Sequence, residues 1–398
     1  MLLKVRLAYL QRRPHNFLSA NCLCLPQSPF KSLLSPPKIW LLSAQNQTMP
    51  PTYHINPIQD ARWNHLLEKH PDASIFHTPG WLRALKRTYG YEPIVFTTSR
   101  PGFDLSDGIV FCQVKSWVTG SRLVSLPFSD HCQPLVDNSA TFDSLLSALC
   151  SEARDGRWKY IELRPRVSQS AVLDCDANLP AGEQFCFHCL DLSPDIQSVS
   201  SRFHKSCIQR KIRRAEREHL SYQSGRSTAL LGNFYQLLVR TRRRHQLPPQ
   251  PLAWFENLVD CLGESLTIRV LSKDEQPIAS IMTLAFKTSL VYKYGCSDER
   301  FHNLGGMPLL FWNAIQEAKQ SGYQELDFGR SELDNEGLIQ FKGHFGAHCS
   351  RLTYYRSPAA PTGGLSRNWG TRATRHVLSR VPDSVLIPVG NLLYRHLG

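Results

Sequence analysis

The chain has 398 residues, a length that suits two domains of about 150 residues with tails. Its formal net charge is +13, but residues 1–48 contribute +6 and residues 358–398 contribute +4, which leaves +3 for the segment between them. The excess charge therefore belongs to the ends, and it gives no argument that the folded core binds nucleic acid.

The first 48 residues differ in composition from the rest. They contain no acid and are rich in Ser, Pro and Leu, as transit peptides are. The apolar run at 39–42 is too short to cross a membrane, and the layout of a signal peptide is missing. Met49 directly precedes the first segment with the pattern of a folded protein. We expect residues 1–48 to be a disordered or untranslated extension, with Met49 as the start.

Twelve cysteines are spaced irregularly, and Cys186 and Cys189 form the only CxxC pair. A structural zinc site normally needs four ligands, and no second pair stands at the spacing of a zinc finger. We therefore expect no metal site. Buried, reduced thiols in a cytoplasmic protein are the simpler interpretation.

The segment 49–192 reads as one mixed α/β unit. Between residues 57 and 89, apolar side chains recur at helical spacing in two groups, separated by a turn at Pro71. Strands are predicted over 93–98, 108–116 and 122–127, followed by a loop over 130–138, a helix over 142–154 and a strand over 160–164. A linker near 192–194 ends the unit.

The segment 193–357 repeats this order. Helices are predicted over 200–219, 230–244 and 252–262, with a short strand after the first, and then a three-strand meander over 266–271, 278–285 and 290–295. A glycine-containing loop over 298–306 leads to a helix opened by Pro308 and stopped by Gly322, and strands over 325–328 and 351–355 follow.

The order of meander, glycine loop, helix and strand is that of the GNAT acyltransferase fold. Both segments also place an acid, an apolar residue and a turn after a helix, at 156–164 and at 325–331. We therefore predict an internal duplication: an α/β protein with mixed sheets, built from two tandem GNAT-like domains.

Residues 358–398 form a basic tail in which a Pro/Gly-containing linker precedes a partly amphipathic segment. Its apolar positions are surrounded by Arg372, Arg375, Arg380 and Arg395. Such a tail either packs on its own domain or lies on an anionic membrane surface. The sequence leaves both open.

From Met49 to its end, the chain resembles the FemAB-like transferases, most closely the subgroup associated with exosortase/PEP-CTERM systems in bacteria that export polysaccharide. The resemblance rests on FHTPGW at 76–81, SLPF at 125–128, IELR at 161–164, RKIRRA at 210–215, DFGRS at 327–331, FK at 341–342 and the closing segment 381–398. It implies two GNAT-type domains side by side. It also implies transfer of an acyl or aminoacyl group, from acyl-CoA or aminoacyl-tRNA, to an amine or hydroxyl of a cell-envelope precursor.

Acyl transfer to an amine requires removal of a proton and a cation or N–H donors near the developing oxyanion. The resemblance places Lys342 beside the reacting groups. Asp327 and Arg330 stand at a strand end, where the acid could orient or deprotonate the acceptor and the arginine could bind a phosphate or carboxylate. We select Lys342, Asp327 and Arg330 as catalytic candidates. His77, His131 and His344 lie in or near matching segments, but their spacing assembles no catalytic constellation.

Seven further residues are candidates for substrate binding. Arg210, Arg214 and Arg217 share one face of a predicted helix whose other face is apolar, and that basic face suits phosphates or tRNA. Glu162 and Arg164 are the first-domain counterparts of Asp327 and Arg330. Gly305 and Gly306 stand in a loop that departs from the GNAT pyrophosphate loop. Each of these also has a purely structural interpretation, as a solvated face, a local ion pair or a turn.

These observations predict a cytoplasmic acyl- or aminoacyltransferase that acts on a cell-envelope or exopolysaccharide precursor. The tail would allow peripheral contact with the inner face of the membrane. Two alternatives stay open: an acyl-CoA-dependent N-acetyltransferase of GNAT type, and a non-catalytic nucleic-acid-binding protein. The sequence names neither the acceptor nor the oligomeric state.

Overall fold

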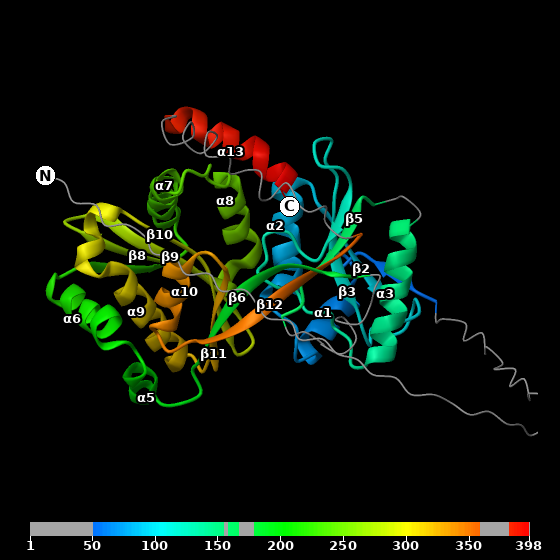
Figure 1. Cartoon of the computed structure of the whole chain (residues 1–398), viewed down its shortest axis with the longest axis horizontal. Helices are drawn as coiled ribbons and strands as arrows, with labels where there is room; N and C mark the ends of the chain where they lie inside the picture. The colour runs from blue at the N-terminus through cyan, green and yellow to red at the C-terminus, as the bar shows by residue number, and fades with distance from the viewer. Residues whose placement is uncertain (1–50, 155–157, 167–178, 359–381, 398) are drawn as a thin grey trace, which may run out of the picture. The chain divides into compact units, whose positions relative to one another are not determined.

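The fold is built on one mixed sheet. The computed structural model describes residues 51–154, 158–166, 179–358 and 382–397, so the predicted extension over residues 1–48 lies outside the described residues. The described strands follow the order β1-β2-β3-β4-β5-β12-β6-β11-β10-β9-β8-β7 (Figure 1). They cover Tyr53–Ile55 (β1), Glu92–Thr97 (β2), Ile109–Val114 (β3), Arg122–Val124 (β4), Tyr160–Leu163 (β5), Ala181–Asp191 (β6), Ser221–Gly225 (β7), Leu266–Lys273 (β8), Gln276–Phe286 (β9), Ser289–Ser297 (β10), Glu325–Glu332 (β11) and His348–Ser357 (β12).

The sheet has two arms with the same internal order. We call β1–β5 the first arm and β7–β11 the second arm. In each arm, antiparallel strands are followed by one parallel pair joined through a helix: β4 and β5 through α3 (Ser139–Arg154), and β10 and β11 through α9 (Gly306–Gln320). The predicted α/β protein with two GNAT-like units is thus confirmed.

Strands β6 and β12 join the arms at the centre of the sheet. They pair with each other, β12 also pairs with β5 of the first arm, and β6 also pairs with β11 of the second. Each of the predicted domains, 49–192 and 193–357, therefore contributes one strand to the edge of the other. By its internal contacts, residues 49–398 form a single compact unit. The boundary at 192/193 stays a prediction.

Helices of both arms share one hydrophobic core. Helices α1 (Ala61–Lys69) and α2 (Pro79–Tyr89) come from the first arm, and α7 (Thr228–Arg244) and α8 (Leu252–Leu262) cover the second. Trp81 packs edge-to-face on Trp254 across the junction, with ring centroids 5.3 Å apart. A Cβ at Gly80 would lie 2.6 Å from the carbonyl oxygen of Cys261, so α2 and α8 approach as closely as they do because position 80 is glycine.

Three local predictions were wrong or missing. The helix expected over 200–219 is broken into α5 (Ile196–Ser201), a π-helical turn (Lys205–Gln209) and α6 (Arg210–Arg217), because His204 caps a new helical start by accepting the N–H of Cys207. Strand β6 was not predicted, since it begins with an exposed, polar stretch that includes Gly182 and Glu183, and only its second half carries buried side chains. Helix α10 (Glu336–Gly343) is short and was also missed.

The end of the predicted tail packs on the protein. Residues 359–381 lie outside the described residues, whereas α13 (Asp383–Leu397) buries Leu386 and bridges both arms. Tyr394 donates to the carbonyl of Pro248, and Tyr91 donates to the carbonyl of Tyr394. Within the described ranges, no helix is both long enough and apolar enough to span a bilayer.

Candidate active site

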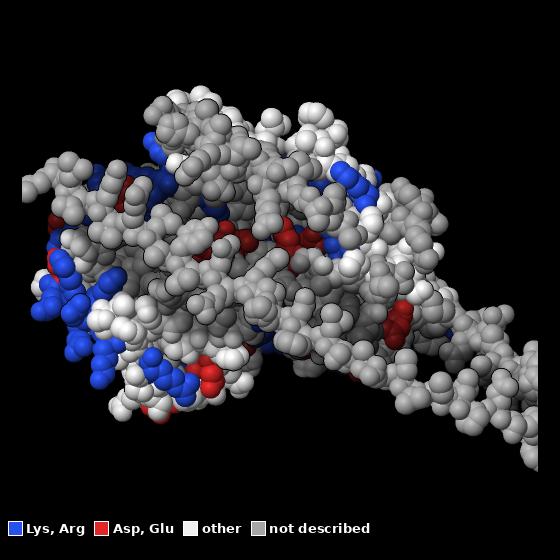
Figure 2. Space-filling model, viewed as in Figure 1, with Lys and Arg blue, Asp and Glu red and all other residues white. Residues whose placement is uncertain are grey.

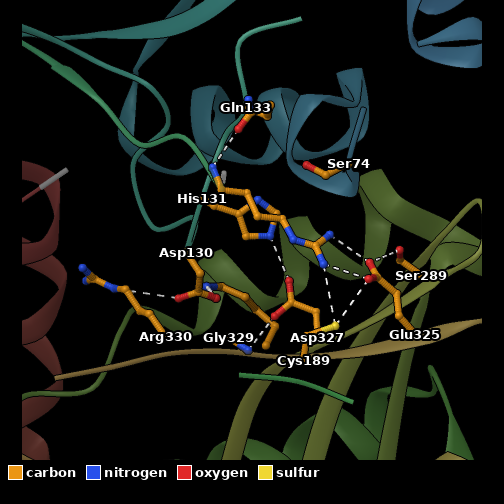
Figure 3. A network of polar contacts seen from close by, with 12 residues as sticks. Ser74, Asp130, His131, Gln133, Cys189, Ser289, Glu325, Asp327, Gly329 and Arg330 are labelled. Atoms are coloured by element: carbon orange, nitrogen blue, oxygen red, sulfur yellow. Dashed lines mark hydrogen bonds and ion pairs between the residues drawn. The ribbon is translucent and has the colours of Figure 1, made fainter. Parts of the chain in front are cut away.

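An acid and a histidine from different arms meet in the interior. Asp327 is the last residue of β11 that pairs with β10, and His131 lies on the loop after β4. Their Oδ2 and Nε2 atoms are 2.9 Å apart, and both side chains are almost fully buried (Figure 3). Asp327 Oδ1 also accepts the N–H of Gly329 at 2.6 Å. The carboxylate is thus fixed at both oxygens, and it orients the imidazole ring.

The other ring nitrogen of His131 has no hydrogen-bond partner among the described residues, although it is buried. If Nε2 donates its proton to Asp327, Nδ1 carries the lone pair. A buried nitrogen without a partner is costly in a folded protein unless a ligand or water satisfies it. This arrangement provides a proton acceptor whose orientation is set by Asp327.

Lys342 of α10 lies beneath the same bend of β11. Its Nζ donates to the carbonyl oxygens of Gly329 at 3.0 Å and Arg330 at 2.9 Å, and only 2% of the residue is exposed. Burial lowers the pKa of Lys342 to about 8, although Asp130 and Asp327 oppose that shift. At neutral pH the ammonium is therefore mostly charged, and it sits under the Asp327–Gly329 turn.

Asp130, next to His131 in the first arm, forms ion pairs with cations of the second arm. Its carboxylate lies 2.9 Å from Nζ of Lys293 on β10 and 3.9 Å from Nε of Arg330 (Figure 3). Burial raises the pKa of Asp130, but Lys293 and Arg330 outweigh burial and leave it below the ordinary value. Arg330 also stacks over Phe185 at 4.0 Å. Three cations, counting Lys342, surround the two carboxylates.

Gly329 allows this close approach. It has a φ of 70°, in the left-handed region, and a Cβ there would lie 3.0 Å from Oδ2 of Asp130. The β11–β6 register shifts between Asp327 and Gly329, so the strand has a bulge at this point. The bulge turns Asp327 toward His131 and brings the backbone next to Asp130.

A cavity of about 640 Å³ lies beside the dyad of His131 and Asp327, and both residues line it. Its wall includes Arg166, which donates to both oxygens of Glu325 at 2.9 and 2.8 Å. Burial alone would raise the pKa of Glu325, but the bonds from Arg166 bring it to about 2. The remaining wall is rich in hydroxyl and amide groups, from Ser74, Gln133, Ser193, Thr288, Ser289 and Gln324.

A sequence profile of the acetyltransferase (GNAT) domain family matches residues 202–342, which include the whole second arm and end at Lys342. The chain contains a GNAT acetyltransferase domain. No curated protein sequence matches the chain.

Solved structures show the fold around the GNAT domain. FemX superposes with a TM-score of 0.59 at 13% identity, over 76% of this chain and 96% of that one. L-PGS from Bacillus licheniformis has a TM-score of 0.51 at 15% identity, over 80% and 95%. The C-terminal domain of a protein assigned as a lysylphosphatidylglycerol synthetase from Agrobacterium fabrum has a TM-score of 0.50 at 15% identity, over 83% and 96%. This chain therefore shares its fold with FemX and with these two proteins.

The structure brings the three predicted catalytic residues together. Asp327, Arg330 and Lys342 lie around the bulge of β11, and their roles stay predictions. Asp130, His131, Lys293 and Arg166 were not selected from sequence. The available signal was the Asp130–His131 pair, which lies two and three residues beyond the matching SLPF segment at 125–128.

Glu162 and Arg164, two of the predicted substrate-binding residues, form an ion pair with each other. Arg164 Nη2 lies 2.7 Å from Oε1 of Glu162, and its guanidinium stacks over Tyr354 at 5.0 Å. Arg164 also donates to the carbonyl of Leu126 at 2.7 Å. Substrate binding by this pair would require the ion pair to open.

The basic face of α6 is exposed. Arg210, Arg214 and Arg217 are exposed while Ile212 and Ala215 are buried, and Figure 2 shows Lys and Arg side chains gathered over this helix at the left of the view. The structure places them on the surface, apart from the dyad of His131 and Asp327.

GNAT domains use acyl-CoA as the donor, and the predicted pyrophosphate loop is Gly305–Gly306 at the start of α9. The carbonyl oxygen of Lys211 on α6 lies 2.4 Å from the position a Cβ would take at Gly305. Asp298, whose pKa bonds from Arg300 hold at about 2, caps the preceding turn, and its charge is balanced by Arg240 and Arg300, each 2.6 Å away. The backbone of Lys211 therefore limits the space on the α6 side of Gly305, while the charges around the loop do not exclude an anion.

One described group has the residue types of a metal site. The potential ligand atoms of His204, Cys207 and His344 lie within 4.8 Å of one another. However, Nδ1 of His204 accepts the N–H of Cys207 at 3.2 Å, so a neutral ring carries its proton on Nε2 and cannot bind a metal through that atom. The three side chains lack the fourth ligand of a structural zinc site.

Proposed function

We propose that this protein transfers an acyl or aminoacyl group to an amine or hydroxyl of a cell-envelope or exopolysaccharide precursor. One observation carries the proposal: the dyad of His131 and Asp327, assembled from both arms, lines a polar cavity and leaves Nδ1 without a partner. Fixed ammonium and guanidinium groups lie within the same cluster.

The reaction follows from these groups. The acceptor nitrogen or oxygen attacks the acyl carbon, and its proton passes to Nδ1 of His131. Asp327 stabilises the imidazolium that forms. The negative charge on the tetrahedral intermediate is stabilised by the ammonium of Lys342, which has three donors and uses two on backbone carbonyls. Collapse releases the donor's thiolate or ribose oxygen, which takes the proton from His131.

The cavity supports a polar acceptor. Hydroxyl, amide and charged side chains make up most of its wall, whereas a site for an apolar ligand is lined mainly by hydrophobic side chains. A sugar-containing envelope precursor, rich in hydroxyls, fits this chemistry. The neighbour named for lysylphosphatidylglycerol synthesis supports the wider class in which a cell-envelope molecule receives an amino acid.

Two donors are tested in parallel. Labelled acetyl-CoA and aminoacylated tRNA would each be incubated with the protein and with amine- and hydroxyl-bearing envelope precursors, and labelled product would be measured. We expect product with one donor, and its loss in His131→Gln while circular dichroism and the melting temperature are retained. Absence of product with both donors, or full activity in His131→Gln, would contradict the proposal.

An acyl-CoA-dependent N-acetyltransferase is the second candidate, because the GNAT profile match covers the whole second arm from α6 onward. Product formed from acetyl-CoA alone would select it. Non-catalytic nucleic-acid binding is the third, motivated by the exposed arginines of α6. It predicts RNA or duplex affinity that falls steeply with salt and is unchanged in Lys342→Met.

A further inference from the structure

Exposed apolar side chains are concentrated on one surface. Among the described residues, eight large apolar side chains are exposed, and five of them lie on two adjoining segments. Trp117, which is 88% exposed, and Val118 stand on the loop between β3 and β4. Val385, Leu392 and Leu397 stand on α13. We call these five side chains the Trp117 surface.

Hydrogen bonds fix the two segments to each other. Ser116 Oγ and Nδ1 of His396 are 2.9 Å apart, and Thr119 donates to the carbonyl oxygen of His396 at 3.2 Å. Arg122 donates to the same carbonyl at 2.7 Å, and the ring of Trp117 lies edge-on against His396 at 5.6 Å. The Trp117 surface is therefore one preformed feature, made by the loop and the helix together.

The charge around this surface is positive. Lys115 and Arg395 are exposed at its edges, residues 115–121 contain no acid, and α13 has a single acid, Asp383, at its first position. Exposed tryptophan and leucine rimmed by cations match the interface of an anionic bilayer, where indole rings lie among the headgroups and basic side chains meet phosphate.

We propose that the Trp117 surface docks this protein on an anionic phospholipid bilayer. Trp117 and Leu392 enter the boundary between headgroups and acyl chains, and Lys115 and Arg395 pair with lipid phosphates. The proposal goes beyond the transfer reaction, since it concerns a surface distinct from the cavity beside His131. The two cations at its edges, Lys115 and Arg395, favour lipid over a protein partner, because the core of a protein–protein interface is depleted of charged residues.

The test is flotation with vesicles of phosphatidylcholine, with and without about one quarter phosphatidylglycerol. We expect the wild-type protein to float with the anionic vesicles only, and added salt to weaken binding. The double variant Trp117→Ser/Leu392→Ser should bind about tenfold or more weakly, because two insertions are lost. The matched control is Phe103→Ser/Leu333→Ser, which removes two exposed apolar side chains from other parts of the surface and should bind as wild type does.

Other outcomes would overturn the proposal. Wild-type protein that floats with neither vesicle, or a control variant that loses binding equally, would show that the Trp117 surface does not dock on lipid. If the protein self-associates in sedimentation and the Trp117→Ser/Leu392→Ser variant is monomeric without vesicle binding, the surface is an interface between copies. Transfer to a water-soluble acceptor should be unchanged in the double variant, which separates docking from the proposed reaction.

Discussion

The two arms place an acid at the same structural position and use it differently. Glu162 is the last residue of β5 that pairs with β4, and Asp327 is the last residue of β11 that pairs with β10. In the first arm, Glu162 binds its own neighbour Arg164 at 2.7 Å. In the second arm, Asp327 binds His131 of the first arm instead. The same sequence layout thus gives an ion pair between neighbours in the first arm. In the second arm it gives a dyad with His131, whose Nδ1 has no described partner.

The strand geometry explains the difference. Residues two apart on a regular strand face the same side, so Glu162 and Arg164 meet directly. In β11 the bulge at Gly329 interrupts this alternation, and the loop after β4 fills the space with Asp130 and His131. The second arm therefore differs from the first through one irregular strand and through side chains that the first arm supplies.

The largest expected effect on transfer comes from replacing Asp327, and the equivalent acid of the first arm, Glu162, supplies the comparison. Asp327→Asn should lower kcat/KM by about a thousandfold, because the amide favours the wrong orientation and tautomer of His131 and no longer stabilises its cation. Glu162→Gln is the matched change in the first arm. It should affect the free energy of unfolding more than transfer, since it weakens a mostly buried ion pair. Equal losses of transfer in both variants would mean that the arms share the chemistry.

Lys342→Met should lower kcat by about a hundredfold while leaving KM nearly unchanged, because the ammonium acts on charge that develops in the transition state. Steady-state kinetics with each donor would measure this. Lys293→Met is the comparison, since that cation is already neutralised by Asp130 at 2.9 Å. A Lys342→Met enzyme with normal kcat would remove the lysine from the proposed mechanism.

The lowered pKa of Lys342 also predicts how kcat depends on pH. Since its pKa in the folded protein is about 8, below the ordinary value of 10.5, kcat should fall as pH rises through about 8. Lys342→Arg should move that loss of kcat to higher pH, because guanidinium stays charged.

The stability of the protein should depend on pH in the opposite direction. Between pH 8 and 10.5 the unfolded chain binds more protons at Lys342 than the folded protein does, so the free energy of unfolding should rise with pH relative to Lys342→Met. Denaturant titrations across this range would detect it, and parallel curves would contradict the lowered pKa.

Most of the fold was predictable because its strands and helices carry local patterns. The meander over β8–β10, the helix stop at Gly322 and the strand at 325–328 depend on alternation and turn residues that lie side by side in the sequence. Strand β6 was missed because its first half is exposed and polar, and its place between β12 and β11 depends on pairing with strands that lie far away in the sequence. Pairing over such a distance leaves no local pattern to detect.

The candidate site was predictable only in part. Asp327, Arg330 and Lys342 stand in one short tract of the sequence that ends the GNAT profile match, so a single segment pointed to them. His131 lies 196 residues away from Asp327, and only the pairing of β6 and β12 between the arms brings the two together. No spacing in the sequence encodes a contact made through the centre of a sheet.

The smallest expected effect separates backbone strain from close contact. Gly90 and Gly329 both have left-handed φ values, 73° and 70°, but a Cβ at Gly90 meets nothing within 4 Å, whereas one at Gly329 lies 3.0 Å from Asp130. Gly90→Ala should therefore cost about 1 kcal/mol in the free energy of unfolding, from strain alone. Gly329→Ala should cost about 1 kcal/mol more and also reduce transfer, because the new methyl group displaces Asp130 from Lys293 and Arg330. Chemical denaturation and kinetics of both variants would measure this. Equal destabilisation with full activity in Gly329→Ala would show that the bulge tolerates the methyl group, and that the difference between the arms does not depend on this glycine.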